Sequence, residues 1–366
     1  MSFSHKYLHR YRVIAVIIVL LLSVTVVLTA QDKRQQVIDY LEKARAEQDV
    51  PAISAAVAVN GRIVLAEGVG YADLENSVPA TGKTVYRIAS ISKPVGAIGV
   101  MQLLEQGKVS LEDEIQVYVP SFPEKEQGNV TLWHLLTHTS GIRHYNPGEF
   151  GLMEHFETLD EAIEIFKDDP LKFDPGTQFS YTTYGFNLVQ GVIEAASEMP
   201  IADYMRRYVW QPAGMNNTHF EFPNEIIKSR ARGYQRDRNR MVMNAVYTDV
   251  SIKFIGGGMI STVEDLCRLF IALDRGALIS NDTRMTMYDE HFQINERSWR
   301  ALGWSVGVTQ DGYRSISHSG GATGFRSMLY NFVDDGVIVA VITNNDWFGV
   351  GSVAMDIARM YLPDKN

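Results

Sequence analysis

Two serines and one lysine lie within four residues of each other in RIASISKPVGA, residues 87–97. The hydrophobic pattern that follows predicts a helix beginning near Lys93. Residues three apart lie on one face of a helix, so Ser90 can meet Lys93, whereas Ser92 points about 100° away. A neutral lysine amine beside Ser90 can accept the hydroxyl proton, which would make Ser90 a nucleophile. The alternative interpretation is an N-capping serine followed by a solvated lysine.

Two distant segments carry groups that suit the same chemistry. Tyr181 stands in PGTQFSYTTYGF, just before a helical pattern, and His318 ends a β-rich run in SISHSGGATGF. A lysine in water has a pKa of about 10.4, so a base role for Lys93 requires burial or neighbouring cations. A tyrosine with a lowered pKa could share that task. Backbone N–H groups at the start of the helix would face a developing oxyanion.

Together these three segments resemble the pattern of the serine β-lactamase and penicillin-binding protein superfamily. The segments LLTHTSGI (135–142), PAGMNNT (212–218) and GGGMISTVEDL (256–266) are similar to recurrent segments of its class C β-lactamase-related branch. RIASISK, YVPSFPEKE, SGIRHY and SRARGY are similar to the mitochondrial serine β-lactamase-like members of that branch. The resemblance covers about residues 36–361.

The resemblance implies a role for each of these residues. Ser90 would be the acylated nucleophile, Lys93 its partner in proton transfer, and Tyr181 the general base or a proton shuttle to the leaving group. His318 stands where many relatives have lysine, and it would supply positive charge or a hydrogen bond near Tyr181 and the substrate carboxylate. The backbone N–H groups of Ser90 and Gly321 would form the oxyanion hole, and substrate contacts are expected from Thr183, Ser319 and Gly320.

Thr183 departs from the family pattern, because many relatives carry asparagine at this position. A carboxamide both donates and accepts hydrogen bonds and reaches further than a hydroxyl. The threonine therefore argues against efficient binding of penicillins and cephalosporins, and it favours peptidase or esterase activity over a dedicated β-lactamase. A D-Ala-D-Ala-type carboxypeptidase and a weak β-lactamase stay open. Gly320 and Gly321 are expected to leave room for a substrate backbone.

Strand-like runs lie at both ends of the chain, and helical patterns lie between them. Asn60–Gly61, Asp311–Gly312 and Asp334–Gly336 supply turn residues between β-rich runs. Helical periodicity dominates from about Lys93 to Arg207. We expect an α/β (α+β) fold of the β-lactamase/transpeptidase type. In it, helices flank an antiparallel sheet built from both chain ends, and a mainly helical domain is inserted.

The expected domain boundaries follow from this arrangement. Residues 31–84 plus 251–366 would form the sheet-containing domain, and residues 85–250 would form the inserted helical domain. A cleft between them would hold the site. A capping box from Ser261 to Glu264 is expected to start one helix, and a final amphipathic helix is expected near residues 350–361.

Residues 1–30 predict an export signal or an N-terminal membrane anchor. Three basic residues precede an apolar run, Val13–Ala30, and the position three before a cleavage site after Ala30 is Leu28 instead of a small residue. An uncleaved anchor is therefore slightly favoured, and the rest of the chain should lie outside the cytoplasm.

The charge distribution disfavours nucleic acid as a partner. Three of the 34 basic residues and none of the 43 acidic residues lie in residues 1–30, which leaves a net charge of −12 on the remainder. The basic run 228–240 is interpreted as a solvated loop or hairpin edge. His134 and His138 are four apart but lack the acidic partner of a metal motif, so neither a metal nor a cofactor is expected. The single cysteine, Cys267, is expected to pack in the core.

The sequence thus predicts an exported serine hydrolase that works through an acyl-enzyme on a small peptide, ester or lactam. The rival hypothesis is a non-catalytic binding or scaffolding protein that keeps the fold. No G-x-S-x-G elbow is present, which argues against a serine–histidine triad with His318 as its base. The oligomeric state does not follow from the sequence.

Overall fold

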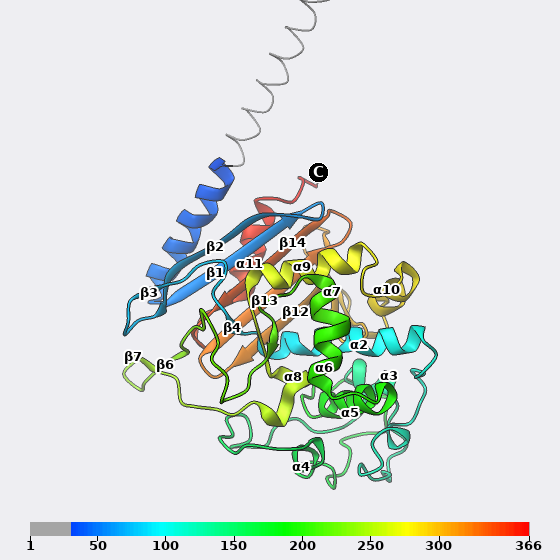
Figure 1. Cartoon of the computed structure of the whole chain (residues 1–366). Coiled ribbons are helices and arrows are strands. Elements are labelled where there is room, and N and C mark those ends of the chain that lie inside the picture. The colour runs from blue at the N-terminus through cyan, green and yellow to red at the C-terminus, as the bar shows by residue number, and fades with distance from the viewer. Residues whose placement is uncertain (1–30, 366) are drawn as a thin grey trace, which may run out of the picture.

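The computed structural model describes residues 31–365, and an antiparallel sheet runs through their centre (Figure 1). In this part of the chain the sheet has nine strands in the order β3-β2-β1-β14-β13-β12-β11-β10-β9. The strands are β1 (Ala52–Val59), β2 (Arg62–Asp73), β3 (Val78–Pro79), β9 (Phe292–Asn295), β10 (Ser298–Arg300), β11 (Ser305–Val308), β12 (Arg314–Ala322), β13 (Phe325–Phe332) and β14 (Val337–Thr343). The predicted α/β fold, with a sheet built from both chain ends, is confirmed.

Tight turns join the neighbouring strands, as the sequence predicted. Asn60 and Gly61 link β1 to β2 with φ angles of 49° and 73°, which a two-residue hairpin turn requires. Gly312 and Gly336, with φ angles of 80° and 63°, lie in the turns that lead into β12 and β14. The two ends of the chain meet in the sheet, because Ile53–Val59 of β1 pairs with Val337–Thr343 of β14.

The central strands are buried on both faces. Along β14, Ile338, Ala340 and Ile342 belong to one hydrophobic core, while the alternating valines belong to a second. The second core is covered by a helix over residues 31–47 and by α11 (Val350–Arg359), the predicted C-terminal helix. The first core is covered by α9 (Val263–Asp274) and, beyond it, by α2 (Ser92–Glu105). The sheet therefore lies between two helical layers (Figure 1).

The remaining helices lie outside the large sheet, and several of them pack against α2. The helices are α3 (Leu132–Leu136), α4 (Leu159–Ile163), α5 (Gly185–Ser197), α6 (Ile201–Met205), α7 (Gln211–Ala213), α8 (Phe254–Gly257) and α10 (Asn281–Tyr288). Two small sheets are formed by β4 (Tyr86–Arg87), β8 (Met259–Ser261) and β5 (His219–Phe220), and by the hairpin of β6 (Tyr234–Arg236) and β7 (Val242–Asn244). The basic run is thus part of a hairpin, as predicted. The domain boundaries stay predictions.

The predicted capping box at Ser261 is wrong by one residue. The Thr262 hydroxyl caps α9 by accepting from the Asp265 N–H, because Ser261 still belongs to β8 and pairs there with Tyr86. Cys267 on the same helix is fully buried, as expected.

Within residues 31–365, no helix combines the length and the apolar character that a membrane crossing needs. The predicted export signal or anchor in residues 1–30 lies outside the described residues.

Candidate active site

Ser90 lies in a short 3₁₀ turn, Ala89–Ile91, directly before α2. Ala89 has a φ of 50°, in the left-handed region that residues with a side chain seldom adopt. Backbone strain of this kind persists where the surrounding structure holds it, often at functional sites. Ser92 begins α2, and its buried hydroxyl donates to Ala89 O at 2.7 Å and accepts from the Met259 N–H at 3.1 Å. Ser92 is therefore scaffold, as helical geometry predicted.

Lys93 is fully buried, and its amine points at Ser90. Nζ lies 3.1 Å from Ser90 Oγ, 3.1 Å from Thr183 Oγ1 and in hydrogen-bond contact with Gly256 O. The Gly256 carbonyl accepts from Nζ, whereas the Ser90 and Thr183 hydroxyls can accept from the amine or, when it is neutral, donate to its lone pair. Burial first, and then the charge of Lys253, hold the pKa of Lys93 well below its ordinary value. The amine is thus suited to act as a base.

Tyr181 lies beside both residues. Its ring centre is 5.0 Å from Lys93 Nζ, and its hydroxyl hydrogen-bonds with Ser90. Burial raises the pKa of Tyr181 to about 12, although the bond to Ser90 and the charge of Arg300 oppose the shift. The sequence analysis allowed a tyrosine with a lowered pKa, and for Tyr181 this prediction is wrong. The protonated hydroxyl is suited to carry a proton and not to act as the resting base.

His318 faces Tyr181 from β12, with 6.3 Å between the ring centres. Burial is the main cause that lowers the pKa of His318 to about 3. Nδ1 lies 2.7 Å from Ser319 O, a carbonyl that only accepts, so Nδ1 carries the hydrogen. Nε2 is then a buried acceptor with no partner among the described residues. Of the two predicted roles, a hydrogen bond is favoured over a positive charge.

Thr183 is almost fully buried and is engaged by the protein itself. Its hydroxyl contacts the Lys93 amine and hydrogen-bonds with the Tyr145 hydroxyl, and its N–H donates to His144 Nδ1 at 3.1 Å. Thr183 therefore holds Lys93 in place. The predicted contact between Thr183 and substrate stays a prediction.

The glycines of β12 let this strand pack closely against the turn Ala89–Ile91 that carries Ser90, the nucleophile turn. A Cβ added to Gly320 would lie inside 3.0 Å of Ile88 O and Ser327 Oγ, and 3.2 Å from Ala89 Cβ. We expected the missing side chain of Gly320 to leave space for a substrate. Atoms of Ile88, Ala89 and Ser327 occupy that space instead. Gly321 follows directly, which places its backbone near Ser90. Ser319 is exposed.

One edge of β12 is open beside these residues. The pairing of β11 with β12 runs from Arg314 to Ser317 and stops there. Residues 318–322 pair only with β13 in the described chain. Their unpaired backbone groups are available to an extended ligand.

Arg300 and Lys253 were missed by sequence reasoning. Arg300, on β10, stacks its guanidinium 4.7 Å from the Phe179 ring centre and acts on the pKa of Tyr181 and His318. Lys253 lies on the other side, near Tyr145 and Lys93. Neither belongs to a recognisable motif, so no local signal pointed to them.

His138 is a buried neighbour of Tyr181, with ring centres 4.3 Å apart. Its Nδ1 accepts from the Thr182 N–H at 3.2 Å. His134 and His138 do not share a helix face, because α3 ends at Leu136.

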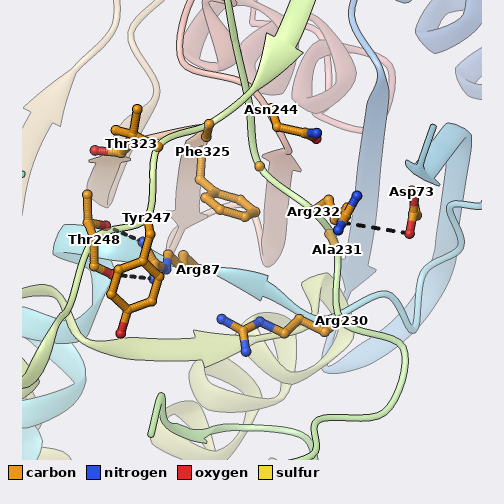
Figure 2. Close-up of a pocket in the computed structure, with 13 residues that line it drawn as sticks. Asp73, Arg87, Arg230, Ala231, Arg232, Asn244, Tyr247, Thr248, Thr323 and Phe325 are labelled. Atoms are coloured by element: carbon orange, nitrogen blue, oxygen red, sulfur yellow. Dashed lines mark hydrogen bonds and ion pairs between the residues drawn. The ribbon is translucent and has the colours of Figure 1, made fainter. Parts of the chain in front are cut away.

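A cavity of about 580 Å³ opens beyond the end of β12 (Figure 2). Thr323 and Phe325 line one side of it, and Arg87, Arg230 and Tyr247 line the other. Ser90, Lys93, Tyr181 and His318 do not line this cavity, so it is separate from the group of residues around Ser90. The Phe325 ring lines this cavity, whereas Trp304 and Tyr184 are buried core residues.

Sequence comparisons agree with this geometry. The profile of the family described as Beta-lactamase matches residues 37–357. The chain is 31% identical to the mitochondrial serine beta-lactamase-like protein LACTB of Homo sapiens, covering 90% of this chain and 79% of that protein. It is 27% identical to penicillin-binding protein 4* of Bacillus subtilis, covering 78% of this chain and 68% of that protein.

A solved structure has the same fold. The octameric penicillin-binding protein homologue from Pyrococcus abyssi superposes with a TM-score of 0.79 at 26% identity, covering 88% of this chain and 75% of that one. Since the family profile spans nearly the whole described chain and a relative exceeds 30% identity, this chain belongs to the beta-lactamase family of serine-hydrolase-fold proteins.

Proposed function

We propose that this chain is a serine hydrolase that cleaves peptide, ester or lactam carbonyl groups through an acyl-enzyme on Ser90. One observation carries the proposal: the Lys93 amine is fully buried, 3.1 Å from Ser90 Oγ, with two hydroxyls and a carbonyl as its polar neighbours. A lysine so placed is held neutral by burial, and a neutral amine can accept the serine proton.

Acylation then follows from the positions of four groups. Lys93 takes the proton of Ser90 as Oγ attacks the carbonyl carbon, and the backbone N–H groups of Ser90 and Gly321 receive the oxyanion. When the tetrahedral intermediate collapses, the bond to the leaving group breaks. The leaving group takes the Tyr181 proton, and the Lys93 ammonium returns a proton to Tyr181.

Deacylation reverses these transfers with water in place of the leaving group. A water gives its proton to the neutral Lys93–Tyr181 pair and attacks the acyl carbon. The bond between Ser90 Oγ and the acyl group breaks, and Ser90 recovers its proton. His318 offers Nε2 as a buried acceptor beside Tyr181, where a donor on the substrate or a water can bind it.

Peptides and esters are favoured over β-lactams as substrates. The Thr183 hydroxyl is engaged by Lys93 and Tyr145, so it offers little to a lactam side chain. The open edge of β12 suits an extended acyl chain. Arg300 supplies a cation on the Tyr181 side, which suits a leaving group that ends in a carboxylate. A carboxypeptidase-type substrate therefore fits the site.

The rival function, a non-catalytic scaffold, does not need the buried amine. Taking a lysine amine out of water is costly, and a scaffold of the same fold would be more stable with an apolar residue at Lys93. The strained turn at Ala89 is a second cost of this kind. Both costs fit a site that performs chemistry.

A fluorophosphonate probe tests the proposal. We expect one adduct, on Ser90, that disappears in Ser90→Ala. Ser92→Ala is the matched control, since Ser92 is two residues away and scaffold, and it should keep the adduct if it folds. Absence of label in the folded wild-type protein, or label that survives Ser90→Ala, would contradict the proposal.

We also propose that the enzyme is exported, with residues 1–30 as a signal peptide or membrane anchor. The basic flank and apolar run of that segment support the proposal. A reporter that is active only outside the cytoplasm, fused after residue 366, would be active with residues 1–30 and inactive without them.

A further inference from the structure

We propose that Lys253 is a positioning residue of this site, a fixed second cation that keeps the Lys93 amine unprotonated. This inference deepens the proposed function and rests on it. Lys253 ends a 3₁₀ turn, Ser251–Lys253, directly before α8. It lies 160 residues from Lys93 in sequence, yet it stands three residues before Gly256, whose carbonyl accepts from the Lys93 amine.

The Lys253 side chain is held at both ends. Its stem runs along α8: a Cβ added to Gly256 would lie 3.5 Å from Lys253 Cβ, and one added to Gly257 would lie 3.8 Å from its Cδ. Nζ donates to Phe150 O at 3.2 Å and lies 5.1 and 5.2 Å from the ring centres of Tyr145 and Phe150. These neighbours stabilise a cation without neutralising it.

A short chain of contacts links the two amines. Lys93 Nζ contacts the Thr183 hydroxyl, which hydrogen-bonds with Tyr145, and Lys253 lies over the Tyr145 ring. Gly256, whose carbonyl accepts from Lys93, is three residues after Lys253. A like charge at this position disfavours the protonated form of Lys93. In agreement, Lys253 is the charge that lowers the pKa of Lys93 after burial.

The other titratable groups near Lys93 are neutral at pH 7. The pKa of His318 is lowered to about 3 and that of His144 to about 4, while that of His138 is lowered well below its usual value, in each case mainly by burial. Burial also raises the pKa values of Tyr145 and Tyr181.

Two permanent cations, Arg300 and Arg87, lie nearby, but the groups whose pKa they change do not include Lys93. Arg300 acts on Tyr181, His138 and His318. Burial, and then the charge of Arg87, lowers the pKa of Lys253 to about 8, which leaves it mostly charged at pH 7. Within residues 31–365, Lys253 is thus the cation whose charge acts on Lys93.

Carbon-13 NMR of protein labelled at lysine Cε tests the inference without depending on turnover. The Lys93 resonance is identified by its loss in Lys93→Arg, and its position is followed against pH. We expect Lys253→Met to move the Lys93 midpoint upward by roughly one pH unit. Lys253→Arg keeps the charge and should restore the wild-type midpoint. Lys172→Met removes an exposed lysine that acts on His144 and should leave the midpoint in place.

The rate of Ser90 labelling by the fluorophosphonate supplies a second readout. Labelling of wild type should rise with pH as Lys93 loses its proton, and Lys253→Met should move that rise upward by the same interval. At a pH below the rise, labelling should fall roughly tenfold. A Lys93 midpoint that does not move in folded Lys253→Met overturns the inference. If Ser90 is never labelled but the midpoint moves, the proposed hydrolase function fails and the role of Lys253 stands.

Discussion

A single methyl group at Gly320 should disable the site while leaving the fold in place. The Cβ of Gly320→Ala would fall inside 3.0 Å of Ile88 O and Ser327 Oγ. Ser327 can rotate its hydroxyl away, although it then loses its hydrogen bond to Ile88 O. Ile88 O is backbone, one residue before Ala89, so its retreat moves the turn that carries Ser90.

The size of the effect follows from this geometry. Restoring ordinary van der Waals contact requires a displacement of roughly 1 Å, and a misplacement of that size costs roughly 100-fold in rate. We therefore expect the second-order rate of Ser90 labelling by a fluorophosphonate to fall about 100-fold in Gly320→Ala. The thermal midpoint should fall by several degrees, as expected for overpacking that costs roughly 1–3 kcal/mol.

Gly351→Ala is the matched control. Gly351 lies in α11, and nothing lies within 4 Å of an added Cβ. This change should leave labelling unaltered and stabilise the helix by up to about 1 kcal/mol. Wild-type labelling by Gly320→Ala would refute the argument, because the nucleophile turn would then tolerate a displacement that we consider disabling.

Three further predictions concern Lys93, Tyr181 and Arg300. The folded-state pKa of Lys93 is depressed, so its penalty on folding is absent above pH 10.5 and grows as pH falls. The free energy of urea unfolding of wild type should therefore fall, relative to that of Lys93→Met, by about 1.4 kcal/mol per pH unit between pH 10 and pH 8. If the two free energies instead change in parallel with pH, folded Lys93 is charged. Tyr181→Phe should slow hydrolysis of an amide by roughly 100-fold or more and of its p-nitrophenyl ester much less, because p-nitrophenolate leaves without a proton; equal losses would exclude the shuttle. Arg300→Met should raise KM roughly tenfold for a peptide ending in a free carboxylate and leave its amide-capped form unchanged, and equal changes would remove the proposed carboxylate contact.

A charged His318 and a neutral His318 predict different pH dependences of activity. A protonated His318 would make activity fall as pH rises past an ordinary histidine pKa. Because burial lowers the pKa of His318 to about 3, no such limb is expected between pH 5 and 8. A fall in activity across that range that is lost in His318→Gln would restore the charged role.

Local features of the chain were predictable from the sequence. The spacing of Ser90 and Lys93 assigned the lysine to the correct serine, because three residues on a helix define one face. The Asn60–Gly61 turn was predictable because both residues tolerate positive φ. Such signals depend on neighbours in the chain, so no tertiary information was needed.

The electrostatics of the site were not predictable in the same way. Lys253 and Arg300 come from separate loops and strands, and they matter only because folding brings them beside Lys93 and Tyr181. The direction of the Tyr181 shift depends on how much water the folded chain removes from the hydroxyl. The role of Gly320 depends on the contact between β12 and the turn at Ala89.

Trapping the acyl-enzyme tests the central claim most directly. The protein is mixed with p-nitrophenyl esters, D-amino-acid peptides and nitrocefin, quenched in acid within milliseconds to seconds, and measured by intact mass spectrometry and peptide mapping. We predict a mass increase equal to the acyl group of an ester or peptide, on the peptide that contains Ser90, absent from Ser90→Ala and strongly reduced in Lys93→Met. Turnover of any of these substrates without a covalent adduct on Ser90, or an adduct that persists in Ser90→Ala, would contradict the account.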